Sequence, residues 1–339
     1  MKAIIPVAGA GTRLRPHTYT QPKPLIPVAG KPIIAFIIES LQKAGIQDFV
    51  FVIGYLGEKV RSYVEENHKD IKAEFVVQEH REGLGHAIWT AREAFETEQE
   101  ILIVLGDIIF ETDLSLFIQS PTSCIGVRKV NDPREFGVVE LENGENLIKR
   151  VIEKPRIPRS DLAIVGIYKI KEVQQLTNCL KNNIENDVRS LEEIQLTDAI
   201  EDMILQGTSF TTQSVDTWFD CGKKEILLET NRVLLDREGY DLANIPNFET
   251  AIIIHPVRIG EGCKISNSVV GPHVTIGDHT TIESSILQNS IIGNYSILKE
   301  ITLQNSIIGS DTLIKGPQQS LNIGDNTEID FSSMFQQKP

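Results

Sequence analysis

A glycine-rich segment near the start of the chain combines small residues with arginine. Residues 8–16 read Ala-Gly-Ala-Gly-Thr-Arg-Leu-Arg-Pro. Glycines allow backbone N–H groups to approach an anion closely, and Arg13 adds a cation that suits phosphate oxygens. The segment lacks the Gly-Lys-Ser/Thr ending of a Walker A loop, and Leu14 breaks the dinucleotide pattern G-x-G-x-x-G. It therefore indicates a phosphate site, although an ordinary tight turn uses the same residues.

A lysine and two aspartates could complete such a site. Prolines flank Lys23 on both sides and restrict the backbone, so its ammonium group is presented from a stiff loop. Asp107 and Asp220 each stand in a loop that contains glycine. Because Mg²⁺ prefers a few carboxylates together with phosphate oxygens of a substrate, we expect both aspartates to bind it. Taken singly, an Asp beside a Gly is more often a turn residue.

Composition excludes several classes of protein. The chain has 339 residues, 41% of them hydrophobic, which allows sizeable cores and most simply two domains. Its formal charge of −14 opposes nonspecific attraction to nucleic acid and anionic membranes. No apolar run approaches the about 20 residues that span a bilayer, and the start does not read as a signal peptide. The 4 cysteines are widely separated and suggest reduced thiols. We therefore expect a cytoplasmic protein that handles small molecules.

The first part of the chain alternates strand and helix patterns, which predicts an α/β domain with a mainly parallel sheet. Asp107 lies just beyond the end of a buried strand, where open α/β sheets bind ligands. The predicted strands are 2–7, 49–53, 75–77, 101–105 and 163–170, and the predicted helices lie around 34–41, 88–95, 196–205 and 223–235.

A different pattern begins at residue 251. Ile or Val recurs every five to six residues and is often followed by Gly, as in Ile276-Gly277 and Ile323-Gly324. Such repeats suit a parallel β-helix, in which small residues turn the corners and stacked Ile and Val fill the interior. We therefore expect a first domain at 1–240, a linker at 241–250 and a β-helix at 251–330.

The order of the motifs resembles that of the sugar-1-phosphate nucleotidylyltransferases. The motifs after Lys23 are Gln78, Gly-Leu-Gly-His-Ala at 83–87, Leu-Gly-Asp at 105–107, Phe-Gly-Val-Val at 136–139, Glu-Lys-Pro at 153–155 and Trp-Phe-Asp-Cys-Gly at 218–222. The resemblance covers most of residues 1–240, and long members of the family also end in hexapeptide repeats. It implies a Rossmann-like nucleotidyltransferase domain followed by a left-handed parallel β-helix.

The resemblance also implies a reaction. The phosphate of a sugar 1-phosphate attacks the α-phosphorus of a nucleoside triphosphate in line and expels pyrophosphate, without a covalent enzyme intermediate. Arg13 then stabilises the leaving pyrophosphate, Lys23 holds phosphate near the attacked centre and Lys154 grips the sugar phosphate. Asp107 and Asp220 hold the cofactor Mg²⁺ between the reacting groups.

Base and sugar recognition are implied in the same way. Gln78 offers a hydrogen-bond donor and an acceptor to a pyrimidine edge. Ile108 stands where thymidylyl enzymes commonly have Asn, while Ala8 and the 83–87 segment are closer to uridylyl enzymes, so thymine and uracil both stay open. Glucose 1-phosphate is favoured among the sugars. The implied nucleotide-binding residues are Ala8, Gly9, Gly11, Thr12, Arg13, Gln78 and Gly83, and the implied sugar-phosphate residues are Gly137, Glu153, Lys154 and Val165.

Two other functions stay open. The β-helix could host acyl transfer, alone or as a second activity, with His255, His273 or His279 as a base. The chain could also be a regulatory protein that binds a nucleotide sugar without turnover, although its full set of charged motif residues argues against this. A short β-helix exposes coil edges and Ile-rich faces, so we expect a homo-oligomer whose assembly needs the repeat domain.

Overall fold

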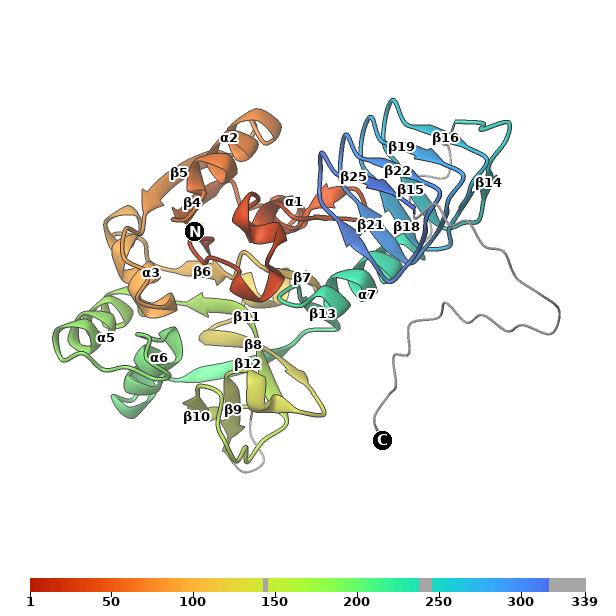
Figure 1. Cartoon of the computed structure of the whole chain (residues 1–339). Helices are drawn as coiled ribbons and strands as arrows, with labels where there is room; N and C mark the ends of the chain where they lie inside the picture. The colour runs from red at the N-terminus through yellow and green to blue at the C-terminus, as the bar shows by residue number, and fades with distance from the viewer. Residues whose placement is uncertain (143–145, 238–245, 317–339) are drawn as a thin grey trace.

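The computed structural model describes residues 1–142, 146–237 and 246–316 (Figure 1). The repeat unit Ile323-Gly324, the end of the predicted β-helix and half of the predicted linker lie outside these residues. The predicted domain boundaries therefore stay predictions. No helix in the described part of the chain is long and apolar enough to span a bilayer. All four cysteines are free thiols, as expected.

A mixed sheet of nine strands forms the centre of the first part. Its parallel section runs β6-β1-β4-β5, and β11 pairs antiparallel to β6. The expectation of a mainly parallel sheet holds for that section and for the pair β12-β8, whereas β11 pairs antiparallel with β6, β8 and β9. Strands β9 and β10 are joined by a short connection, which permits only antiparallel pairing. The strands are β1 (Lys2–Pro6), β4 (Asp48–Ile53), β5 (Lys72–Val77), β6 (Ile101–Val104), β8 (Ser123–Lys129), β9 (Val138–Leu141), β10 (Ile148–Ile152), β11 (Leu162–Ile170) and β12 (Phe210–Ser214).

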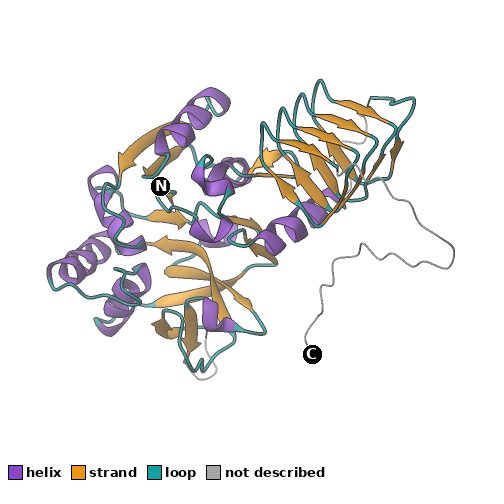
Figure 2. Cartoon of the chain, in the orientation of Figure 1, coloured by secondary structure: helices purple, strands orange, loops and turns teal. Residues whose placement is uncertain are grey.

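Helices cover both faces of this sheet (Figure 2). The apolar residues of α1, α2 and α7 join one buried cluster, and those of α3, α5 and α6 join the cluster on the opposite face. The stripe that predicts the first helix is confirmed, since Ile34, Ile37, Ile38 and Leu41 are fully buried. The helices are α1 (Ile33–Lys43), α2 (Gly57–Asn67), α3 (Leu84–Thr90), α4 (Ser115–Ile118), α5 (Val173–Glu185), α6 (Leu196–Leu205) and α7 (Lys224–Leu235).

The repeats form a three-sided parallel β-helix of four described coils, the left-handed type that the resemblance implies. Equivalent residues of successive coils are 17 or 16 positions apart, as in the pairs Ile252↔Val269 and Ile297↔Leu313. The three sheets are β14-β17-β20-β23, β15-β18-β21-β24 and β16-β19-β22-β25. Their strands are β14 (Ile252–Ile253), β15 (Val257–Ile259), β16 (Lys264–Ser266), β17 (Val269–Val270), β18 (Val274–Ile276), β19 (Thr281–Glu283), β20 (Ile286–Gln288), β21 (Ser290–Ile292), β22 (Ile297–Lys299), β23 (Thr302–Gln304), β24 (Ile307–Ile308) and β25 (Leu313–Lys315).

One sheet of the β-helix packs against the first part of the chain through α7. Asn231 of α7 is fully buried, and its Oδ1 accepts hydrogen bonds from the backbone N–H of Ala29 at 2.9 Å and from Oγ1 of Thr275 at 2.6 Å. Its Nδ2 donates to the carbonyl oxygen of His273 at 3.2 Å. A single amide therefore ties the loop after β2 (Pro27–Val28), helix α7 and the β-helix together.

Candidate active site

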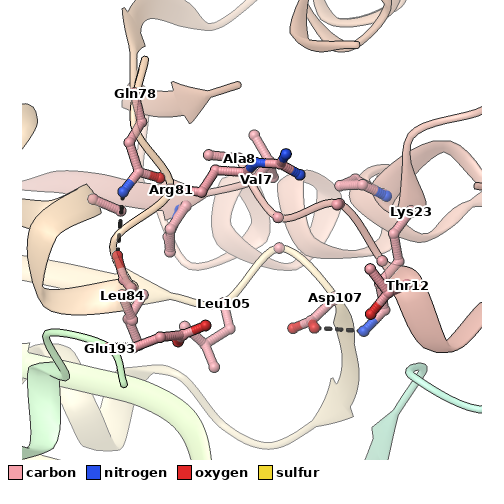
Figure 3. Close-up of a pocket in the computed structure, with 18 of the residues that line it drawn as sticks. Val7, Ala8, Thr12, Lys23, Gln78, Arg81, Leu84, Leu105, Asp107 and Glu193 are labelled. Atoms are coloured by element: carbon pink, nitrogen blue, oxygen red, sulfur yellow. Dashed lines mark hydrogen bonds and ion pairs between the residues drawn. The ribbon is translucent and has the colours of Figure 1, made fainter. Parts of the chain in front are cut away.

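Two adjoining cavities lie beyond the carboxyl ends of β1 and β6. The larger, of about 980 Å³, is lined by the glycine-rich segment, the loop that follows Gln78, and Asp107 (Figure 3). The smaller, of about 220 Å³, is lined by Gly137, Glu153, Lys154 and Val165 among others. The residues that line both are Arg13, Leu84, Leu105 and Asp107. The structure thus gathers the two predicted binding sets into neighbouring cavities that share a wall, and their roles stay predictions.

A two-stranded ladder brings the predicted metal ligands together. Strand β7 (Ile108–Glu111) pairs antiparallel with β13 (Thr217–Asp220), and Ile108 lies opposite Asp220. The backbone N–H of Cys221 also donates to the carbonyl oxygen of Asp107 at 3.1 Å. Two loops that are distant in sequence therefore place their carboxylates side by side.

Lys23 lies between the two carboxylates. Its Nζ is 2.5 Å from Oδ2 of Asp107 and 3.7 Å from Oδ1 of Asp220, and the Lys23 side chain is only 9% exposed. Nη2 of Arg13 lies 3.6 Å from the other oxygen of Asp220. The site therefore pairs two cations with two carboxylates where the two cavities meet.

The charges determine the ionisation of Asp107. Desolvation raises the pKa of this carboxyl. The charge and hydrogen bond of Lys23, together with the charge of Arg13, lower the pKa by a larger amount. The net pKa of Asp107 lies below its usual value, so the group is an anion at neutral pH.

The donor set fits Mg²⁺. Oxygens of Asp107 and Asp220 both contact the same lysine nitrogen, so they are no farther apart than the sum of those two distances. No group of three His, Cys, Asp or Glu side chains suited to a metal occurs among the described residues. Two carboxylates, with the remaining positions left to water and phosphate, match the preference of Mg²⁺ rather than that of a structural metal.

The glycine-rich segment is held in an unusual backbone conformation. Gly11 has φ +59°, and a Cβ there would lie 2.9 Å from Cγ2 of Thr18. The Oγ1 of Thr18 donates to the carbonyl oxygen of Gly11 at 2.8 Å. A Cβ at Gly222 would lie 2.5 Å from the guanidinium of Arg13. These glycines let Thr18 and Arg13 approach the backbone closely.

The smaller cavity has its own fixed polar groups. Oε2 of Glu153 accepts from Oγ1 of Thr197 at 3.0 Å, and Oε1 of Glu153 lies 3.5 Å from Nζ of Lys154. Lys154 has φ +38°, and its N–H donates to the carbonyl oxygen of Phe136 at 3.1 Å. A Cβ at Gly137 would lie 3.2 Å from Oε2 of Glu153. The Glu-Lys pair therefore faces a cavity and is not a solvated surface pair.

Sequence reasoning missed the loop before α6. Glu193 lines the larger cavity, whereas Gln195 and Thr197 line the smaller one. The N–H of Ile194 donates to the carbonyl oxygen of Glu82 at 2.8 Å, so the loop is tied to the 82–85 segment. The loop carries no glycine, and its contacts with the 82–85 segment reveal it.

The histidines considered for acyl transfer have other environments. Nε2 of His273 lies 2.8 Å from Oδ1 of Asp236, at the junction with α7. The ring of His279 stacks on that of Tyr295, with centroids 5.2 Å apart, and His255 is exposed between β14 and β15. Each histidine therefore has a structural explanation or an exposed position.

Comparisons with known proteins point to one family. A family model described as nucleotidyl transferase matches residues 2–237. The bifunctional protein GlmU of Methanocaldococcus jannaschii is 37% identical over 77% of this chain and 61% of its own length. A glucose-1-phosphate thymidylyltransferase of Streptomyces griseus is 28% identical over 86% of this chain and 87% of its own.

Solved structures agree on the fold. A UDP-glucose pyrophosphorylase in complex with UDP-glucose superposes with a TM-score of 0.60 at 24% identity, over 69% of this chain and 97% of that one. The chain spans less than two thirds of the length of the GlmU relative it matches.

Proposed function

Because the chain belongs to the nucleotidyl transferase family, we propose that it joins a nucleoside triphosphate to a sugar 1-phosphate and releases pyrophosphate. We favour UTP or dTTP as the nucleotide and glucose 1-phosphate as the sugar. The observation that carries the proposal is the shared wall of the two cavities, where Arg13 and Asp107 face both. The α-phosphorus would lie at this wall, with the nucleotide on one side and the sugar on the other.

In this mechanism, a phosphate oxygen of the sugar 1-phosphate forms a bond to the α-phosphorus as the bond to pyrophosphate breaks. Arg13 stabilises the leaving pyrophosphate, Lys23 holds the α-phosphate and Lys154 holds the sugar phosphate. Asp107 and Asp220 would hold Mg²⁺, which offsets the negative charge of the phosphates. Catalysis is then positioning and charge neutralisation.

Recognition uses the remaining lining residues. Gln78 faces the base, and the backbone of the glycine-rich segment and Gly83 completes the nucleotide pocket. Glu153 accepts hydrogen bonds from sugar hydroxyls, with backbone contacts at Gly137 and packing from Val165.

A substrate screen tests the proposal. Four nucleoside triphosphates are combined with a panel of sugar 1-phosphates and Mg²⁺, and pyrophosphate release is measured. We expect release with UTP or dTTP and glucose 1-phosphate. Tight nucleotide-sugar binding without release would favour the regulatory function, and transfer from an acyl donor would favour the β-helix as a second catalytic site.

A further inference from the structure

The hydrogen bonds of Gln78 fix the orientation of its side-chain amide. Nε2 of Gln78 lies 3.2 Å from the carbonyl oxygen of Gly83 and 2.9 Å from Nδ1 of His86. A carbonyl oxygen only accepts, so the atom that faces Gly83 is the amide nitrogen, and its second hydrogen points to His86. This network assigns Nδ1 of His86 as an acceptor and places the proton of the neutral ring on Nε2.

The amide oxygen of Gln78 is the atom left for a ligand. The side chain is 5% exposed and lines the larger cavity. Its Oε1 has no hydrogen-bond partner among the described residues. Figure 3 shows the amide nitrogen on the dashed line toward the loop before α3, with the oxygen on the other side. The sequence alone suggests that Gln78 offers both a donor and an acceptor, whereas here its donors are used within the protein.

We propose that His86 is a positioning residue that holds Gln78 with its amide oxygen toward the ligand, as a hydrogen-bond acceptor. This orientation restricts the base of the nucleotide to uracil or thymine, whose N3 carries a hydrogen. The proposal rests on the proposed function. Cytosine presents an unprotonated N3 at the same place, where it would oppose the oxygen of Gln78. A glutamine free to turn over could donate to that N3 instead, so the fixed orientation acts by rejecting the wrong base. His86 itself does not line the cavity, and it acts only through Gln78.

The surroundings of His86 keep its ring neutral. Desolvation lowers the pKa of His86, Glu82 raises it, and His80 and Arg189 lower it, with a net pKa below the usual value. Glu82 and His80 lie in the loop before α3, and Arg189 lies in the loop after α5 and pairs with Glu82 at 2.7 Å. Protonation in acid would place a hydrogen on Nδ1 of His86, opposite the amide hydrogens of Gln78. The ring could then no longer accept from Gln78 and hold its amide in this orientation.

Two variants of His86 test this role. His86→Leu removes the acceptor, while His86→Asn keeps one, because its amide oxygen can accept in place of Nδ1. We measure kcat and KM for UTP, dTTP and CTP at saturating sugar 1-phosphate. His86→Leu should lower the preference for UTP or dTTP over CTP by about tenfold, through KM rather than kcat, which corresponds to one lost hydrogen bond of about 1.4 kcal/mol. His86→Asn should keep the wild-type preference. His255→Asn, an exposed histidine of the β-helix, is the control.

A pH series supplies a second readout that does not depend on His86→Leu folding. KM for UTP or dTTP should rise in the wild type as the pH falls from about 7 to about 5, and should stay flat in His86→Asn. Two results would refute the proposal that His86 orients Gln78. One is an unchanged base preference in folded His86→Leu, and the other is a KM in His86→Asn that depends on pH as it does in the wild type. A wild-type protein that releases no pyrophosphate with any of the nucleoside triphosphates would instead refute the proposed function.

Discussion

Lys23 and Asp107 form an ion pair of 2.5 Å between the proline-flanked loop at residues 22–24 and the loop that follows β6. The lysine is nearly buried, whereas the aspartate side chain keeps 36% of its surface exposed toward the cavities. Removal of the Lys23 charge takes from the Asp107 carboxylate its ion-pair partner at 2.5 Å. Removal of the Asp107 charge leaves the Lys23 ammonium with the more distant carboxylate of Asp220, at 3.7 Å.

Asp107→Asn and Asp220→Asn should each lower turnover by on the order of 10²-fold, because each removes about 3 kcal/mol of charge stabilisation from the transition state. The fold should persist, since one carboxylate still faces Lys23. Pyrophosphate release at limiting Mg²⁺ measures the effect. Asp216→Asn, at an exposed position near the start of β13, is the matched control. Near-normal turnover in both variants would refute the metal assignment.

Lys23→Met should change how stability depends on pH. The pKa of Asp107 is lowered in the folded state, so its contribution is present above the unfolded pKa and is lost as the pH falls through the folded pKa. Without Lys23 this pKa rises, and the contribution shrinks. The difference in melting temperature between the two proteins should therefore widen as the pH rises from about 3 and then level off.

Lys31→Met is the control for this series, because Lys31 pairs with Glu39 at the surface, at 2.8 Å. A melting difference for Lys23→Met that stays constant from about pH 3 to about pH 7 would show that Lys23 does not influence the ionisation of Asp107.

Gln78→Ala should raise KM for the preferred nucleotide about tenfold to hundredfold, as expected for a buried hydrogen-bonding group. KM for the sugar phosphate should change much less, because Gln78 lines only the larger cavity. Steady-state kinetics with each substrate varied in turn measures both effects. Equal effects on the two substrates would contradict base recognition by Gln78.

Parts of this site could be predicted from the sequence because they carry local signals. Gly11, two residues before Arg13, and Gly106, directly before Asp107, mark loops, and the spacing of Ile34, Ile37 and Ile38 marks a helix face. The ladder that joins Ile108 to Asp220 has no local signal, since it pairs segments far apart in the chain. The antiparallel direction of β11 also depends on partners elsewhere in the sheet.

Gly83→Ala should loosen the loop before α6. Gly83 has φ +112°, and a Cβ there would lie 2.5 Å from the carbonyl oxygen of Ile194. The backbone strain and the clash together should lower stability by about 2–4 kcal/mol. KM should rise for both substrates, because Glu193 and Gln195 of the same loop line the two cavities.

Gly207→Ala separates strain from contact in that experiment. Gly207 has φ +95°, but nothing lies within 4 Å of a Cβ at this position. Thermal unfolding should show a smaller loss for Gly207→Ala than for Gly83→Ala, and KM should not change. Equal losses in stability would show that the contact with Ile194 contributes little.

The β-helix should mediate self-association through one of its two uncovered sheets. In β18 and β21 all three residues are buried, because α7 and neighbouring segments cover the outer face of that sheet. In β20 and β22 only the central residue is fully buried, so their outer faces are open. The exposed apolar residues are Ile252 and Ile286 on one open sheet and Ile297 and Leu313 on the other. Apolar faces of this kind are commonly covered by a second subunit.

Charge substitutions can identify the sheet involved. Light scattering at micromolar concentration should show an oligomer for the full chain and a lower mass after deletion of the residues beyond 244. Ile252→Glu with Ile286→Glu, or Ile297→Glu with Leu313→Glu, should dissociate the oligomer, because a charge buried at an apolar interface costs several kcal/mol. Gln304→Glu adds an exposed charge to the first sheet outside its apolar column and should leave the mass unchanged. A monomeric full-length chain would refute the prediction, and an oligomer that survives the deletion would place the interface in the first domain.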